Sequence, residues 1–201
     1  MENSLDNLTA QIKQRYFVEL EASARHVHVT KEQAKLLFGH DLTEKRPLSQ
    51  PGQFLANERV SVRGSKGCLD QVAVLGPCRK EAQVEISLTD GRLLGILPEI
   101  RLSGDIEGTG GAELIGPCGS VVLDQGVIAA QRHIHMTPED AKLQKVRHGD
   151  VVRLKTMTAR PVVFENVAVR VSEDYRTFAH LDFDEANACG FHRGDLGMIV
   201  P

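Results

Sequence analysis

One segment of this chain occurs twice, and the duplication restricts the folds that the chain can adopt. ASARHVHVTKEQAKL, which begins at Ala22, matches AAQRHIHMTPEDAKL, which begins at Ala129, at a separation of 107 residues. Further along, VAVLGPCRKEAQVEI corresponds more loosely to VAVRVSEDYRTFAHL. A chain built from two such copies is expected to form two similar halves related by pseudo-twofold symmetry.

Each copy combines a strand, a short helix and several further strands. Short runs rich in Val, Ile and Leu are separated by Gly, Pro, Asn and Asp, a pattern typical of β-strands joined by turns. The helices are expected after Thr30 and Thr137, which suit N-caps, and Pro138 suits a first helical turn. Because this order fits a small barrel better than a doubly wound sheet, we expect a mainly β protein with short helices. The expected architecture is two tandem small β-barrel domains related by an internal repeat.

The expected boundaries follow from the repeat. Residues 1–17 form an N-terminal amphipathic helix, 18–100 the first barrel half, 101–125 a Gly-rich crossover and 126–201 the second half. The helix is predicted from Leu5, Leu8, Ile12 and Tyr16, which follow helical spacing. It is either a terminal helix docked on its own domain or a detachable helix that binds a partner or targets the protein.

Composition excludes several classes of partner. A net charge of −3 and a pI near 6.2 do not favour binding to nucleic acid or to a membrane surface. No apolar run approaches the roughly 20 residues that span a bilayer, and the polar N-terminus lacks the order of a secretory signal. The four cysteines are scattered and form no CxxC motif, which favours a reducing, cytoplasmic setting.

The two HxH motifs are the candidate metal sites. Side chains at i and i+2 of a strand lie on one face, so His26 and His28 point the same way, as do His133 and His135. A single HxH is often only an exposed strand face, but its duplication favours chelation of a divalent metal. Imidazole suits Zn²⁺ best, with Fe, Co, Ni or Cu also compatible with the ligand type.

The repeat also indicates a third ligand in each half. Glu85 in AQVEIS corresponds to His180 in FAHLDF, which gives six donors, enough for two sites of three protein ligands each. How the six divide between two ions stays open. Arg79 precedes Glu85 by six residues and is either a surface residue or a guanidinium for phosphate or carboxylate. These residues alone indicate metal-assisted transfer or hydrolysis at an anionic group.

Several motifs in order resemble one family. SARHVHVT, GQFLANERVSV, VAVLGPCRKEAQVEIS, RLSGDIEGTGGAELIGPCGSV, GVIAAQRHIHMTPEDA and FENVAVRVSEDYRTFAHLDFDEANA are similar to PduL-type phosphotransacylases, the phosphate propanoyltransferases. The resemblance covers Val18 to Pro201. It implies two tandem β-barrel domains, two zinc ions, and the reversible reaction of acyl-CoA with phosphate to give acyl phosphate and CoA.

The resemblance also implies roles for single residues. Arg79 takes the position of the catalytic, phosphate-binding arginine. Ser103 and Asn187 fall in motifs near the substrates, and Ala22, Ser23 and Ala24 precede the first HxH on the expected path of CoA. Ala24 departs from the family, because many members have Asn there. The metal ligands implied are His26, His28, Glu85, His133, His135 and His180, and the two HxH strands are expected to meet at one shared two-metal site.

The implied partners are CoA or acyl-CoA, phosphate and further copies of the chain in a homo-oligomer. Some members of this family work inside bacterial microcompartments and carry an N-terminal encapsulation helix. The stripe of Leu5, Leu8 and Ile12 would then bind shell or lumen proteins, although it runs into the first strand without a Pro/Gly-rich linker. The alternatives are a dizinc hydrolase of thioesters or phosphate esters and a non-catalytic metal-binding or scaffold protein.

Overall fold

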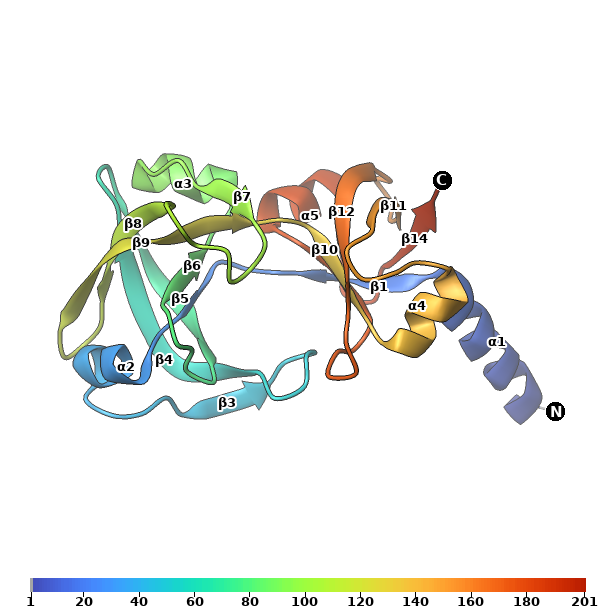
Figure 1. The fold of residues 1–201 in the computed structure, drawn as a ribbon, viewed down its shortest axis with the longest axis horizontal. Helices are drawn as coiled ribbons and strands as arrows, with labels where there is room; N and C mark the ends of the chain where they lie inside the picture. The colour runs from blue at the N-terminus through green and yellow to red at the C-terminus, as the bar shows by residue number, and fades with distance from the viewer. Residues whose placement is uncertain (1) are drawn as a thin grey trace. The chain divides into compact units, whose positions relative to one another are not determined.

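The computed structural model describes residues 2–201, and these form two compact units (Figure 1). One unit is Ala24–Gln131, and the other joins the N-terminal segment through Ser23 to Arg132–Pro201. Strands make up most of the regular structure in both units, and the helices are short apart from the N-terminal one. The prediction of a mainly β protein with two small barrels is therefore confirmed.

The barrel of Ala24–Gln131 has six strands. They are paired in the order β4-β5-β2-β6-β9-β8, and β8 closes the ring by pairing with β4. Two further strands, β3 (Glu44–Pro47) and β7 (Glu99–Arg101), extend the sheet at its edges, and the helices are α2 (Lys31–Phe38) and α3 (Leu88–Leu94). The barrel strands are β2 (His26–His28), β4 (Phe54–Arg63), β5 (Cys68–Gly76), β6 (Gln83–Glu85), β8 (Gly110–Ile115) and β9 (Ser120–Ala130).

The second unit contains a closed barrel with the same pairing pattern. Its strands follow the order β1-β13-β10-β12-β11-β14, and its helices are α1 (Glu2–Tyr16), α4 (Pro138–Gln144) and α5 (Phe183–Cys189). The HxH strand lies between a parallel and an antiparallel neighbour in both barrels. The strands are β1 (Val18–Ala22), β10 (His133–Met136), β11 (Val151–Met157), β12 (Val163–Val171), β13 (Phe178–Leu181) and β14 (Leu196–Val200).

The two copies of the repeat exchange their first strands. β1 leads into the HxH strand β2 but pairs with β13 and β14 of the second barrel. Its counterpart β9 leads into the HxH strand β10 but pairs with β6 and β8 of the first barrel. Each barrel therefore has six strands, of which one is contributed by the other copy of the repeat.

The compact units consequently do not follow the boundaries expected from the sequence. The first strand of the range 18–100 completes the barrel of the other half. The range 101–125 is more than a crossover, because it contains β8 and the beginning of β9, which form an antiparallel pair. Strand pairing over a long sequence separation decides both boundaries, and the local sequence pattern does not report it.

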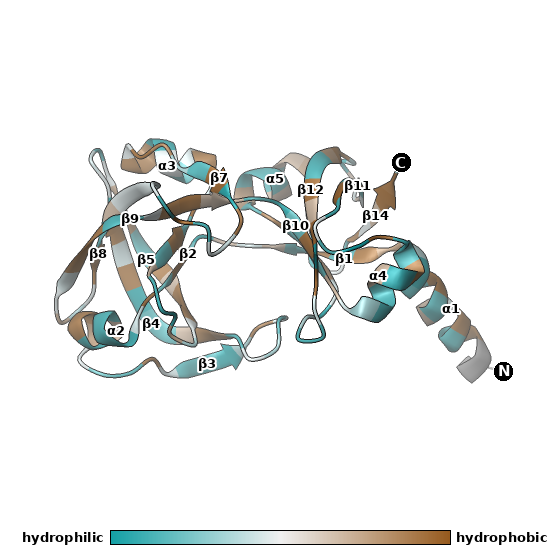
Figure 2. Ribbon diagram, viewed as in Figure 1, coloured by the Kyte–Doolittle hydropathy of each residue, from teal (hydrophilic) through white to brown (hydrophobic). Residues whose placement is uncertain are grey.

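Each barrel has its own aliphatic core. Val27 lies between the two histidines of β2 and Ile134 between those of β10, and both are fully buried in the core of their barrel. The alternation of a strand places the histidines on the opposite face. Figure 2 shows hydrophobic residues recurring along the barrel strands, whereas α4 is mostly hydrophilic. The core therefore fixes which way the histidines point.

The predicted helix caps are present. The Thr30 hydroxyl accepts a hydrogen bond from the Gln33 N–H in a full capping box, and Gly39 ends α2 in the left-handed region at φ 79°. Thr137 caps α4 by accepting from the Asp140 N–H, with Pro138 in its first turn. Both short helices therefore begin at the predicted threonine caps.

The N-terminal helix is docked at its C-terminal end. Gln14 donates a hydrogen bond to Asp140 at 2.9 Å, and Gln144 donates to the Phe17 carbonyl at 3.1 Å. The predicted stripe of Leu5, Leu8, Ile12 and Tyr16 stays 46–69% exposed. The helix is thus held by polar contacts while its apolar stripe faces solvent. Within residues 2–201, no helix has the length and apolar character needed to cross a membrane.

Candidate metal centres

The first centre lies where β2 and β6 run antiparallel. His26 is directly opposite Glu85 in the register, and His28 follows on the same face. The three side chains are 6%, 2% and 8% exposed, and one potential ligand atom from each lies within 4.8 Å of the others. The structure therefore brings together the two histidines and the carboxylate that the repeat predicted.

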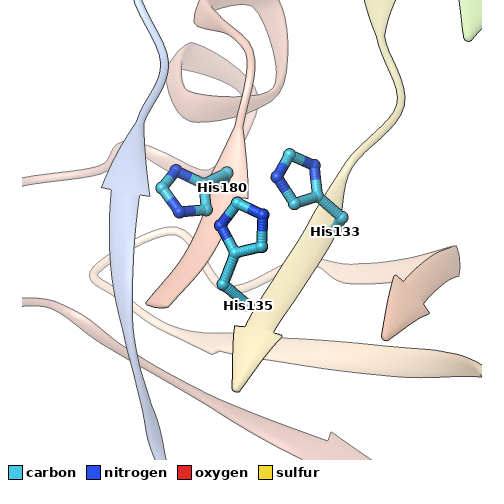
Figure 3. Close-up of side chains that lie close together, drawn as sticks. All are labelled: His133, His135 and His180. Atoms are coloured by element: carbon cyan, nitrogen blue, oxygen red, sulfur yellow. The ribbon is translucent and has the colours of Figure 1, made fainter. Parts of the chain in front are cut away.

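The second centre repeats this arrangement on β10 and β13. His133 is directly opposite His180, and Figure 3 shows His135 converging on the same point. One potential ligand atom of each again lies within 4.8 Å of the others. The rings of His133 and His180 stack with centroids 5.0 Å apart. Glu85 and His180 therefore occupy equivalent register positions, as the repeat predicted.

Hydrogen bonds leave one nitrogen of each ring in the first centre free for a ligand. The Nδ1–H of His26 donates to the Ala24 carbonyl at 2.7 Å, which leaves Nε2 at 3.5 Å from Glu85. The Nδ1 of His28 is buried and has no hydrogen-bond partner. A buried unsatisfied nitrogen is costly, and a metal ion would satisfy it. Two imidazoles and one carboxylate are also a ligand set that Zn²⁺ accepts, so these residues fit a zinc ion.

The protonation states of His28 and Glu85 agree with this interpretation. Burial, aided by the positive charges of His26 and Arg79, lowers the pKa of His28 to about 2, so this imidazole is neutral at pH 7. Burial alone would raise the pKa of Glu85, but the neighbouring His26 and His28 lower it below its usual range. For His26, burial acts to lower the pKa and the Glu85 carboxylate outweighs it, so the pKa is raised. Glu85 is therefore ionised and His28 neutral, as metal ligands must be.

A hydrogen-bond network connects Arg79 to this centre. The Arg79 guanidinium donates to the Ser103 hydroxyl at 3.1 Å, and the Gln83 amide donates to the same oxygen at 2.9 Å. Because both neighbours donate to its oxygen, the Ser103 hydroxyl is left to donate its own hydrogen to the Glu85 carboxylate. This hydrogen bond helps to lower the pKa of Glu85. Two predicted substrate residues, Arg79 and Ser103, therefore lie together beside the first centre.

Gln83 is a site residue that the sequence interpretation missed. Its side chain is 2% exposed, donates to Glu85 at 2.5 Å and accepts a hydrogen bond from the Gly104 N–H at 2.7 Å. Together with the bond to Ser103, both of its amide hydrogens and its oxygen are used. Its position two residues before Glu85 on one strand places it on the ligand face, and that spacing was the available signal.

Two further residues surround the second centre. The Glu21 carboxylate on β1 lies 3.4 Å from the Nδ1 of His180, and the Tyr175 ring lies 4.2 Å, centroid to centroid, from that of His135. Glu21 was also missed, because its strand was expected in the other barrel.

The remaining predicted residues are distributed over both units. Asn187 is exposed on α5, Ala22 ends β1, and the Ser23 N–H donates to the Leu181 carbonyl at 2.7 Å. Ala24 contributes the carbonyl that orients His26. The three histidines outside the two centres are all exposed: His40, His148 and His192.

Comparison with known proteins supports one family. A family model described as phosphate propanoyltransferase matches residues 19–192. The chain is 47% identical to the phosphate propanoyltransferase of Clostridioides difficile, with 100% of this chain and 99% of the relative covered. It is 51% identical to that of Listeria monocytogenes, covering 91% and 87%, and 48% identical to that of Thermotoga maritima, covering 89% and 86%.

These matches span nearly the whole chain, including both HxH motifs and the residues that the structure places around them. The chain therefore belongs to the phosphate propanoyltransferase family and is an acyltransferase.

Proposed function

We propose that this protein transfers an acyl group between CoA and phosphate, converting acyl-CoA and phosphate to acyl phosphate and CoA. Propanoyl-CoA or acetyl-CoA is the proposed acyl donor. The observation that carries the proposal is the network in which Arg79 donates to Ser103 beside the candidate metal ligand Glu85. It holds a guanidinium, the side chain best suited to phosphate, next to a group of buried metal-type ligands.

We further propose that each centre holds one zinc ion. His26, His28 and Glu85 would hold the first, and His133, His135 and His180 the second. A zinc ion bound in this way supplies a Lewis acid for a thioester carbonyl or a phosphate oxygen. The neutral state of His28 and the ionised state of Glu85 support this assignment.

Arg79 would bind the phosphate and hold one of its oxygens in line with the acyl carbon. That oxygen forms the new bond to carbon as the carbon–sulfur bond breaks, and CoA leaves as a thiolate that solvent protonates. A covalent enzyme intermediate is not needed. Burial raises the pKa of the nearby Cys78 thiol, which disfavours the thiolate that would act as a nucleophile.

Thiol release from propanoyl-CoA, followed with a disulfide reagent, tests the proposal. We expect release to require phosphate, to disappear when a chelator strips the metal and to return with added zinc. Release that needs metal but not phosphate would instead indicate a thioester hydrolase. Release that persists in fully stripped protein would contradict the zinc assignment while leaving the acyl transfer in place.

For the N-terminal helix we propose a role in binding shell or lumen proteins of a microcompartment. The support is the exposed stripe on α1, whose side chains face solvent although the end of the helix is docked. Replacing Leu5, Leu8 and Ile12 with Gln should abolish co-purification with microcompartments and leave thiol release unchanged. Unchanged co-purification would contradict this role.

A further inference from the structure

The two candidate metal centres differ in charge. The centre of His26, His28 and Glu85 contains one carboxylate among its three candidate ligands. The centre of His133, His135 and His180 contains three imidazoles and no anionic ligand. A divalent ion would therefore be partly neutralised by its ligands in the first centre and not in the second.

Glu21 supplies a carboxylate next to the second centre. β1 runs parallel to β13, with Glu21 in register with His180, and the Glu21 carboxylate lies 3.4 Å from the Nδ1 of His180. The Glu21 side chain is 36% exposed and that of His180 is 11% exposed. The contact therefore joins a partly solvated carboxylate to a nearly buried ring.

The equivalent position in the first barrel carries no charge. There β9 runs parallel to β6, and the residue in register with Glu85 is Ile128, which is fully buried. One barrel thus has a carboxylate as third ligand with an apolar residue beside it. The other has an imidazole as third ligand with a carboxylate beside it. Because the copies exchange their first strands, this carboxylate comes from the N-terminal end of the chain.

We propose that Glu21 is a positioning residue for the second metal ion, acting through His180. This inference rests on the proposed pair of zinc ions. A carboxylate that accepts from one ring nitrogen fixes the tautomer and the orientation of the imidazole, so that the other nitrogen faces the metal. It also makes the imidazole a stronger donor and gives the second centre the negative charge that its ligands lack.

The test is the zinc affinity of each centre, measured by competition with a chromophoric chelator. Glu21→Gln keeps the size of the side chain and removes its charge. We expect one of the two zinc ions to bind about 10- to 100-fold more weakly, and the visible bands of the Co²⁺-substituted protein to change for that site alone. Glu19→Gln is the matched control. Glu19 lies on the same face of β1, but it is exposed and in register with Phe178.

Double variants separate a specific effect from a general one. His180→Ala should remove the second site. Adding Glu21→Gln to it should not change the affinity of the first site for zinc. Adding Glu21→Gln to Glu85→Ala should still weaken the second site. Glu21→Asp, which keeps the charge, should stay closer to the parent affinity than Glu21→Gln. If Glu21→Gln fails to fold by circular dichroism, Glu21→Ala, which also removes the carboxylate, takes its place.

The possible failures are distinguishable. A parent protein that binds no zinc contradicts the proposed metal pair and this inference together. A parent that binds two zinc ions, with both retained at full affinity in Glu21→Gln, overturns the inference alone. An equal loss in Glu19→Gln also overturns it, because the effect would then be one of net charge rather than of contact with His180.

Discussion

The guanidinium of Arg25 contacts the carboxylate of Asp90 at 2.9 Å, and this pair connects the HxH strand β2 to the helix that follows the third ligand. Arg132 and Glu185 repeat the contact in the other barrel at 2.5 Å. Each Arg immediately precedes the first histidine of its motif, and each carboxylate closes the capping box of its helix. The repeat thus contains, besides the candidate ligands, an ion pair that connects each HxH strand to a neighbouring helix.

Removing Arg25 should destabilise the protein, because Asp90 is only 3% exposed and would be left without its cation. We expect Arg25→Ala to lower the free energy of unfolding by about 1–3 kcal/mol, measured by urea denaturation of the metal-free protein. Arg63→Ala is the control. Arg63 contacts Glu113 at 2.9 Å with both side chains more exposed, so its loss should cost about 0–1 kcal/mol. Equal effects of the two variants would show that burial of Asp90 does not matter.

The grouping of the candidate ligands could be predicted from the sequence because it depends on local rules. Strand alternation places the two histidines of each motif on one face, and the repeat aligns Glu85 with His180. The caps at Thr30 and Thr137 depend on neighbouring residues only. Each of these features is decided within one strand, within one turn or by comparison of the two copies of the repeat.

Glu21 and the domain boundaries could not be predicted in the same way. β1 is joined directly to the first HxH strand, yet it pairs with β13 more than 150 residues away. Both barrels have a parallel strand at that position, so the local pattern does not tell which barrel β1 joins. Gln83 was missed for a different reason. Its residue type allows many partners, and only the fold places Ser103 and Gly104 within reach of its amide.

Glu58 should make stability depend on acid pH. Burial acts to raise the pKa of this carboxyl, but hydrogen bonds from the Thr43 hydroxyl and N–H outweigh it, so the pKa is lowered. A lowered pKa means that the stabilisation is present above the pKa of the unfolded chain and is lost as the pH falls through the folded value.

Glu58→Gln should therefore be less stable than the parent at pH 7, by about 1 kcal/mol, and the difference should shrink towards pH 3. Urea denaturation at both pH values measures it, and Glu44→Gln on the exposed strand β3 is the control. A difference that is the same at pH 7 and pH 3 would mean that ionisation of Glu58 is not its source.

Gln83 should affect the first metal centre and leave the second unchanged. Gln83→Leu removes a donor to Glu85, a donor to Ser103 and the acceptor for the Gly104 N–H. Because such partners orient a ligand, we expect zinc at the first centre to bind about 10- to 100-fold more weakly. Chelator competition measures both sites, so the centre of His133, His135 and His180 serves as an internal control. Weakening of both sites would point to a general loss of structure.

Replacing Arg79 should lower kcat/KM for phosphate and change the KM for the acyl donor little. Its guanidinium donates to Ser103, and we expect Arg79→Ala to lower kcat/KM for phosphate by about 100-fold in the thiol-release assay. The KM for propanoyl-CoA and the bound zinc should change little. Arg79→Lys should recover only part of the loss, because an ammonium is a point charge that cannot match two phosphate oxygens with a planar fork. The adjacent exposed Lys80 provides the control, and Lys80→Ala should behave like the parent. A loss of zinc in Arg79→Ala that parallels the loss of activity would assign Arg79 to support of Glu85, through Ser103, instead of to phosphate.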